Sequence, residues 1–148
     1  MVETLNEAPH FPLKRPLEEA EVARALAALM ADLGSHKEVT LVFVDDAKIQ
    51  RLNRAHREVD APTDVLSYPT SEPDDAADGF VMPDVPHLGD IVISVETAQR
   101  QATEQGHSLT QEVKTLAAHA LTHLLGYDHP TEEAWKRFRS NQARILTL

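Results

Sequence analysis

Hydrophobic positions follow two alternating patterns along the chain. Apolar residues recur every three or four positions in five stretches, which predicts amphipathic helices over residues 17–33, from Asp45 or Asp46 to about 57, 96–105, 109–125 and 131–146. Short runs rich in β-branched residues predict strands over residues 2–8, 38–44, 64–68 and 89–95. The pattern therefore predicts an α/β fold of the α+β type. We expect one compact domain over residues 1–148, with a central sheet of about four strands flanked by about five helices.

The segment over residues 70–87 interrupts this pattern. It is rich in proline and acidic residues and contains no lysine or arginine. Such a composition predicts an acidic loop inserted between two strands. Half of the net charge of −10 comes from five carboxylates in this loop, which are Glu72, Asp74, Asp75, Asp78 and Asp84.

Composition and charge limit the classes of function. The chain has no cysteine, which excludes disulfides and thiolate metal ligands. No apolar run approaches the ~20 residues of a membrane span, and no signal-peptide pattern opens the chain, so we expect a soluble cytoplasmic protein. The acidic balance argues against loose binding to nucleic acid. Basic residues nevertheless cluster, either as a local basic surface or as solvated helix faces: Lys14 and Arg15, then Arg51, Arg54 and Arg57, then Lys136, Arg137, Arg139 and Arg144.

Three histidines near the end of the chain have the spacing of metal ligands. His119 and His123 are four residues apart on a predicted helix, so both imidazoles lie on one face and can reach one ion. Gly126 can end that helix in the left-handed conformation and turn the chain, which brings His129 back toward the same ion. Three neutral nitrogen ligands leave zinc an open position for water, as in catalytic sites. We expect one zinc ion, with nickel or cobalt as substitutes.

This spacing shares its histidines and glycine with the zincin pattern H-E-x-x-H-x-x-G-x-x-H. Ala120, however, stands where a metalloprotease carries its glutamate general base, and no Met-turn follows His129. Peptide hydrolysis by the usual route is therefore disfavoured. A single histidine is more often an ordinary core or surface residue than a ligand, and the chain's other five histidines are interpreted in that way.

A second group of polar residues lies upstream, where a predicted helix turns into a strand at Pro62. Asp60 and Thr63 can cap this turn and Asp64 can begin the strand, which is the plainer interpretation of all three. Arg57 is more indicative of chemistry. A guanidinium beside a metal-bound phosphate would stabilise the charge that develops in phosphoryl transfer, for which a peptidase has no use.

Together these motifs resemble the YbeY family of bacterial rRNA maturation factors. The resemblance rests on residues 52–69, on the run Gly89-Asp90-Ile91-Val92-Ile93-Ser94 and on residues 119–129. It extends in arrangement over nearly the whole chain. The sequence departs from the family in having His56 where an aromatic is usual, Tyr68 for the usual Phe, Ala120 for a common Gly, and its own insertion over residues 71–85.

The resemblance implies a single-strand-specific, metal-dependent endoribonuclease that acts in small-subunit rRNA 3′-end maturation and in ribosome quality control. Zinc would lie on the three histidines, and Arg57 matches the family's arginine beside the metal. The implied partners are rRNA and the small ribosomal subunit, with ribosomal or GTPase assembly proteins as further candidates. Asp128 and Asp64 are candidates for a supporting shell around the site, although Asp128 is as readily a solvent-facing turn residue.

Two other classes of function stay open. A zinc hydrolase of amide or ester bonds would use the histidines and leave Arg57 without a role. A ribosome assembly factor would hold the metal mainly for structure.

Overall fold

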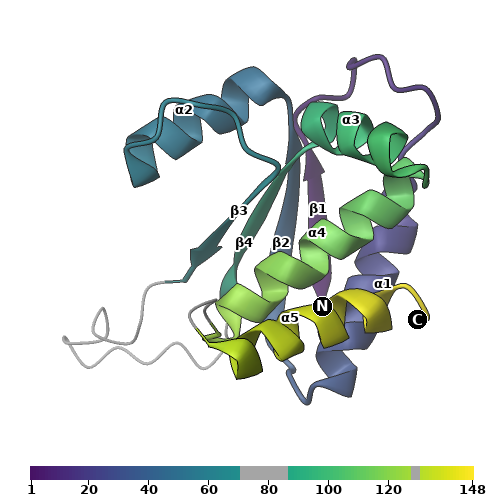
Figure 1. Ribbon diagram of the computed structural model, residues 1–148, viewed down its shortest axis with the longest axis vertical. Coiled ribbons are helices and arrows are strands. Elements are labelled where there is room, and N and C mark those ends of the chain that lie inside the picture. Colours follow the sequence, from purple (N-terminus) through teal and green to yellow (C-terminus); the bar gives the residue numbers. More distant parts are fainter. Residues whose placement is uncertain (71–86, 128–130) are drawn as a thin grey trace.

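The computed structural model describes residues 1–70, 87–127 and 131–148, and these form four strands and five helices (Figure 1). Their order along the chain is β1 (Val2–Asn6), α1 (Glu19–Asp32), β2 (Glu38–Val44), α2 (Asp46–Arg57), β3 (Val65–Pro69), β4 (His87–Ser94), α3 (Val95–Gln105), α4 (Leu109–Leu124) and α5 (Glu132–Ile145). The predicted fold class is confirmed. Of the acidic loop predicted over residues 70–87, residues 71–86 lie outside the described part, and His87 is the first residue of β4 rather than the end of the loop.

The four strands form one mixed sheet in the order β1-β2-β4-β3. β1, β2 and β4 run parallel, while β3 pairs antiparallel with β4. Successive strand residues face opposite sides of a sheet. In β2 and β4, one set of alternating side chains joins the main core with α1, α3, α4 and α5, whereas Val44 and Val92 meet Ile49 of α2 in a smaller cluster. α2 therefore covers the opposite face from the other four helices (Figure 1).

Side-chain caps begin four of the helices. Asp45, Ser94, Ser108 and Thr131 each accept a hydrogen bond from the backbone N–H three residues later, which satisfies one of the free donors at a helix start. This explains the main difference from the predicted boundaries. Val95 was expected in a strand, but the Ser94 cap makes it the first residue of α3. The strand expected over residues 2–8 ends at Asn6, and α1 begins at Glu19 rather than at residue 17.

At Gly89, β4 lies very close to both β3 and α4. A Cβ at this position would overlap the carbonyl oxygen of Tyr68 and lie 2.8 Å from Cδ2 of Leu124. Glycine thus lets β3 and α4 approach the same point of β4, which sets how near the histidine helix lies to the β3 edge of the sheet.

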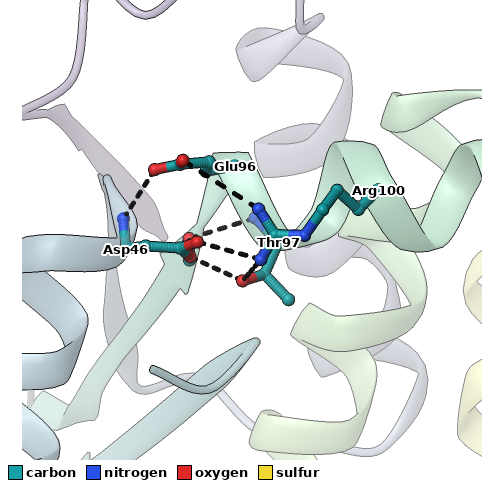
Figure 2. A network of polar contacts seen from close by, with 5 residues as sticks. Asp46, Glu96, Thr97 and Arg100 are labelled. Atoms are coloured by element: carbon teal, nitrogen blue, oxygen red, sulfur yellow. Dashed lines mark hydrogen bonds and ion pairs between the residues drawn. The ribbon is translucent and has the colours of Figure 1, made fainter. Parts of the chain in front are cut away.

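A polar network ties the start of α2 to β4 and α3 (Figure 2). One carboxylate oxygen of Asp46 accepts hydrogen bonds from the hydroxyls of Ser94 at 2.6 Å and Thr97 at 2.5 Å, and the other accepts one from Arg100 at 2.9 Å. The Asp46 N–H donates to Glu96 at 3.2 Å. Burial raises the pKa of the Asp46 carboxyl, but the hydrogen bonds from Ser94, Thr97 and Arg100 outweigh it, so this pKa is lowered overall.

Replacing Gly89 with Ala should destabilise the fold by about 1–3 kcal/mol, because two of the three atoms that the new methyl would meet, the carbonyl oxygen of Tyr68 and Cα of Pro69, are backbone atoms that cannot rotate away. Urea unfolding followed by circular dichroism measures the change. Gly34→Ala is the control, since Gly34 has a positive φ of 78° but nothing within 4 Å of an added Cβ. Equal losses in the two variants would refute a role for close approach at Gly89.

Asp46→Asn should lower the free energy of unfolding by about 1–2 kcal/mol at pH 7, because the charge-assisted bonds to the carboxylate are lost. A carboxyl whose pKa is lowered by folding adds stability above its unfolded pKa and loses it as the pH falls through the folded value. The difference between wild type and variant should therefore shrink below the ordinary pKa of 3.8. Unfolding free energies measured from pH 7 to pH 2 test this; a difference that stays constant would contradict it.

Candidate metal centre

Helix α4 carries two of the three predicted ligands on one face. His119 and His123 lie one turn apart, with ring centroids separated by 5.0 Å and ring planes at 68°. Most of the residues around them are buried, including Ala118, Leu121 and Leu124. The two imidazoles, by contrast, are half-buried. The apolar residues of α4 face the core, and this orientation leaves the two histidines at the edge of the buried surface.

Helix α5 packs against both histidines. The Phe138 ring is fully buried, and its centroid lies 4.8 Å from that of each imidazole. Asn141 fixes α5 against α4 by donating a hydrogen bond to the hydroxyl of buried Thr122 at 2.9 Å. One residue further, Nε2 of Gln142 lies 3.2 Å from Nδ1 of His119. The α5 side chains therefore contact the candidate ligands by both packing and hydrogen bonding.

A cavity of about 210 Å³ opens beside the histidines. It brings together residues from α2, the turn after it, β3 and α4, which are far apart in the sequence. The lining residues are Asn53, Arg57, Thr63, Asp64, Val65, Leu66, Ser67, His119, Ala120 and His123. The two sequence motifs thus meet in one cavity, and Arg57 faces the same space as the candidate ligands.

Arg57 is the last residue of α2, and the turn that follows holds it at the cavity. Glu58 adopts the left-handed conformation that ends the helix. Asn53 is 6% exposed and donates a hydrogen bond to the carbonyl of Ala61 at 2.9 Å, which ties the helix to the turn. The guanidinium of Arg57 reaches β3, where Nη2 donates to the carbonyl of Ser67 at 3.3 Å. The side chain is exposed, so its remaining donors can meet a ligand in the cavity.

Asp64 lines the cavity and also organises the turn. One of its carboxylate oxygens accepts from the N–H of Val65 at 2.8 Å, and the other accepts from Gln101 at 3.3 Å. Its carbonyl accepts from the N–H of Ser94 at 2.9 Å. Asp60 accepts instead from Gln50 at 3.1 Å and does not line the cavity. Asp60 is thus bonded back to α2, whereas Asp64 joins the turn to β3, β4 and α3 and lines the cavity together with the candidate ligands.

The remaining predicted residues, His129 and Asp128, lie outside the described part of the chain. Over residues 1–70, 87–127 and 131–148, no group of three or more metal-binding side chains is found. The described donors nevertheless suit zinc. Two imidazoles on one helical face share a cavity that also holds a cation for an anionic substrate, and imidazole is a preferred zinc ligand.

Two positions that depart from the resembled family contact each other. His56 and Tyr68 make an edge-to-face contact, with ring centroids 5.1 Å apart. Burial raises the pKa of the Tyr68 hydroxyl, while the nearby charge of Arg57 lowers it to a smaller degree. The two exchanges are thus part of one aromatic contact beside Arg57, outside the set of residues that line the cavity.

The sequence interpretation overlooked three residues of the site, namely Asn53, Phe138 and Gln142. A signal was present for the two polar ones. Asn53 follows the buried Ile49 by one turn of α2, and Gln142 follows the buried Phe138 by one turn of α5. A polar side chain at a core-facing position needs a partner, so each marks a buried or half-buried hydrogen bond.

Among the described residues, no helix is both long and apolar enough to cross a bilayer.

Comparison with known proteins agrees with this arrangement. The family model described as endoribonuclease YbeY matches residues 6–148. The chain is 52% identical over 126 residues to "Endoribonuclease YbeY" of Thermus thermophilus, covering 84% of this chain and 86% of that protein. It is 53% identical over 123 residues to the protein of the same name from Deinococcus radiodurans, covering 81% of this chain and 76% of that protein.

A solved structure shares the fold. The solution structure of TM1509 from Thermotoga maritima superposes with a TM-score of 0.62 at 21% identity, and the match covers 99% of this chain and 90% of that one. At this identity the likeness concerns the fold alone. The sequence matches go further, because they cover most of each chain at about half identity: this chain belongs to the endoribonuclease YbeY family.

Proposed function

We propose that this protein is a zinc-dependent, single-strand-specific endoribonuclease that acts in small-subunit rRNA 3′-end maturation and ribosome quality control. Family membership supports the endoribonuclease activity. The structural observation that carries the proposal is the single cavity shared by Arg57 and the two histidines of α4. A metal-dependent site for phosphodiester hydrolysis uses metal ligands beside a cation for the phosphate, and these residues can supply both.

In this proposal His119, His123 and His129 hold the metal. A zinc ion held by them would lower the pKa of its bound water to about 7 and would so supply a hydroxide nucleophile near neutral pH. No carboxylate general base is then needed at position 120. Ala120 lines the cavity beside the two histidines, and its methyl group can neither accept nor donate a proton. This favours the ribonuclease over a protease of the zincin type.

Arg57 acts on the phosphate. Its guanidinium carries a permanent positive charge and presents several N–H donors in a plane, which suits two oxygens of one phosphate. The bond to the Ser67 carbonyl fixes its direction, and the αL turn at Glu58 fixes its position. The charge that builds on the phosphoryl oxygens during cleavage is thus met by a group already in place.

Substrate and partners follow from the same surface. Arg54 and Arg51 are exposed on α2, about one and two turns before Arg57, and can contact phosphates next to the one that is cut. The proposed partners are rRNA and the small ribosomal subunit, together with ribosomal or GTPase assembly proteins, in the cytoplasm. A local basic surface permits this despite the net charge of −10, because half of that charge belongs to the acidic insertion.

His123→Ala should remove most of the bound metal, because the remaining ligands cannot enclose the ion. Elemental analysis of protein purified without added metal should give about one zinc per wild-type chain and far less for the variant. His36→Ala is the matched control, since His36 is exposed and does not line the cavity. Full zinc content in His123→Ala would refute the ligand assignment.

Arg57→Ala should keep the metal and the fold while lowering the rate of RNA cleavage by about 10²-fold or more, if the guanidinium stabilises transition-state charge. Arg57→Lys should recover little of this rate, because an ammonium lacks the planar pair of donors. Arg24→Ala is the control and should leave the rate unchanged, because Arg24 is exposed on α1, forms an ion pair with Glu21 at 2.6 Å and does not line the cavity. Near-complete recovery with lysine would indicate simple electrostatic attraction instead.

One assay separates the proposed function from the two other classes. Metal-defined wild-type protein is incubated with single-stranded RNA, structured RNA, a peptide panel and an ester panel. The proposal requires cleavage of single-stranded RNA that depends on metal, with background rates on peptides and esters. Amide or ester cleavage would favour a different zinc hydrolase. Ribosome association that persists without metal and without any cleavage would favour an assembly factor.

A further inference from the structure

We infer that Gln142 is a positioning residue for the metal centre. Its side-chain amide determines which nitrogen of His119 is available to the ion. The inference rests on the proposed metal site and adds to it a residue from a different helix. Its basis is the contact between Nε2 of Gln142 and Nδ1 of His119 at 3.2 Å.

Gln142 is held firmly enough for this role. It is half-buried on α5, one turn after Phe138, whose fully buried ring packs against both imidazoles. The preceding residue, Asn141, is 7% exposed and bonded to Thr122 of α4. Ile145, which follows Gln142, is fully buried in the main core, so α5 is packed on both sides of Gln142 along the helix and only the side-chain torsions of Gln142 remain to be adjusted.

The chemistry of imidazole makes the contact at Nδ1 important. A neutral imidazole carries one proton, so one nitrogen donates and the other accepts or binds metal. Because Gln142 lies at Nδ1, the metal would be bound through Nε2. Nδ1 must then carry the proton and needs an acceptor, as second-shell partners of metal-bound histidines generally provide.

A glutamine can serve both forms of the histidine. In the structure the amide nitrogen faces Nδ1, so it donates there and favours the tautomer with its proton on Nε2. A half-turn of the amide places its oxygen at the same point, where it accepts from Nδ1–H. The imidazole keeps one proton throughout: the Nε2 proton is released to water and one is taken up at Nδ1. Gln142 would thus stabilise His119 before metal binding and orient it afterwards.

The test compares three variants of the full chain. Gln142→Leu keeps the approximate volume and removes both donor and acceptor. Gln142→Glu keeps an acceptor of the same reach and removes the donor. Gln105→Leu makes the same chemical change at an exposed position at the end of α3 and is the matched control. Zinc affinity is measured by competition with a chromogenic chelator, and the His119 tautomer is read from ¹⁵N chemical shifts of the imidazole in metal-free and zinc-loaded protein.

We expect Gln142→Leu to weaken zinc binding by about 10–100-fold, the usual effect of losing such a partner. Gln142→Glu should bind zinc at least as tightly as wild type, and Gln105→Leu should be unchanged. In metal-free protein the wild type should favour the proton on Nε2 of His119, and Gln142→Glu should favour it on Nδ1. A purely structural role would lower stability in both Gln142 variants without shifting the tautomer.

Two results would overturn the inference while leaving the proposed function intact: wild-type zinc affinity in Gln142→Leu, or a His119 tautomer that does not change between wild type and Gln142→Glu. If the wild-type protein bound no zinc at all, the proposed metal site itself would fail, and the tautomer measurement on metal-free protein would still decide whether Gln142 controls His119.

Discussion

The burial of α4 in the main core is the constraint on which the site depends. Ala117, Ala118, Leu121 and Leu124 lie on the core side of this helix, and their packing fixes its rotation about its own axis. Once that rotation is fixed, residues spaced four apart on the other side of the helix all point away from this part of the core. His119 and His123 occupy that side, so their positions come from hydrophobic packing rather than from any contact between the imidazoles themselves.

The second half of the site reaches the cavity from the opposite face of the sheet. α2 packs on a small cluster around Ile49 and Leu66, and its start is held by the Asp46 network. The chain then turns around the β3 edge, where Asn53 and Asp64 fix the turn. This path of the chain places Arg57 at the cavity that the histidines line. The close approach of three elements at Gly89 keeps the two halves near one another.

Much of the fold could be predicted from the chain because its elements are strongly periodic and clearly capped. The apolar spacing located all five helices, and β-branched runs located the strands, with errors of a few residues at the ends. The Ser94 cap shows why boundaries are harder: one side-chain hydrogen bond decides whether Val95 extends a strand or starts a helix. The His-x-x-x-His spacing placed two candidate ligands on one face because helix geometry is local.

Contacts between elements could not be predicted in the same way. No local pattern indicates that Gln142 reaches His119 from α5, or that Asn53 ties α2 to Ala61, because both depend on how elements pack after folding. The spacing in the sequence indicates only that Asn53 and Gln142 are polar residues at core-facing positions of their helices. That Arg57 and the histidines share a cavity was expected from the family resemblance, whereas their separation in the sequence gave no spatial information.

Because α2 lies alone on one face of the sheet, it can unfold separately from the other helices when the protein is heated. Its small cluster of Val44, Ile49, Leu66 and Val92 is separate from the core that holds α4 and α5. Local opening of α2 would therefore cost less than global unfolding, and it would carry away the arginine while the imidazoles stayed in position. On heating, such a molecule passes first into a state that keeps α4, α5 and most of its tertiary structure, while Arg57 has left the cavity.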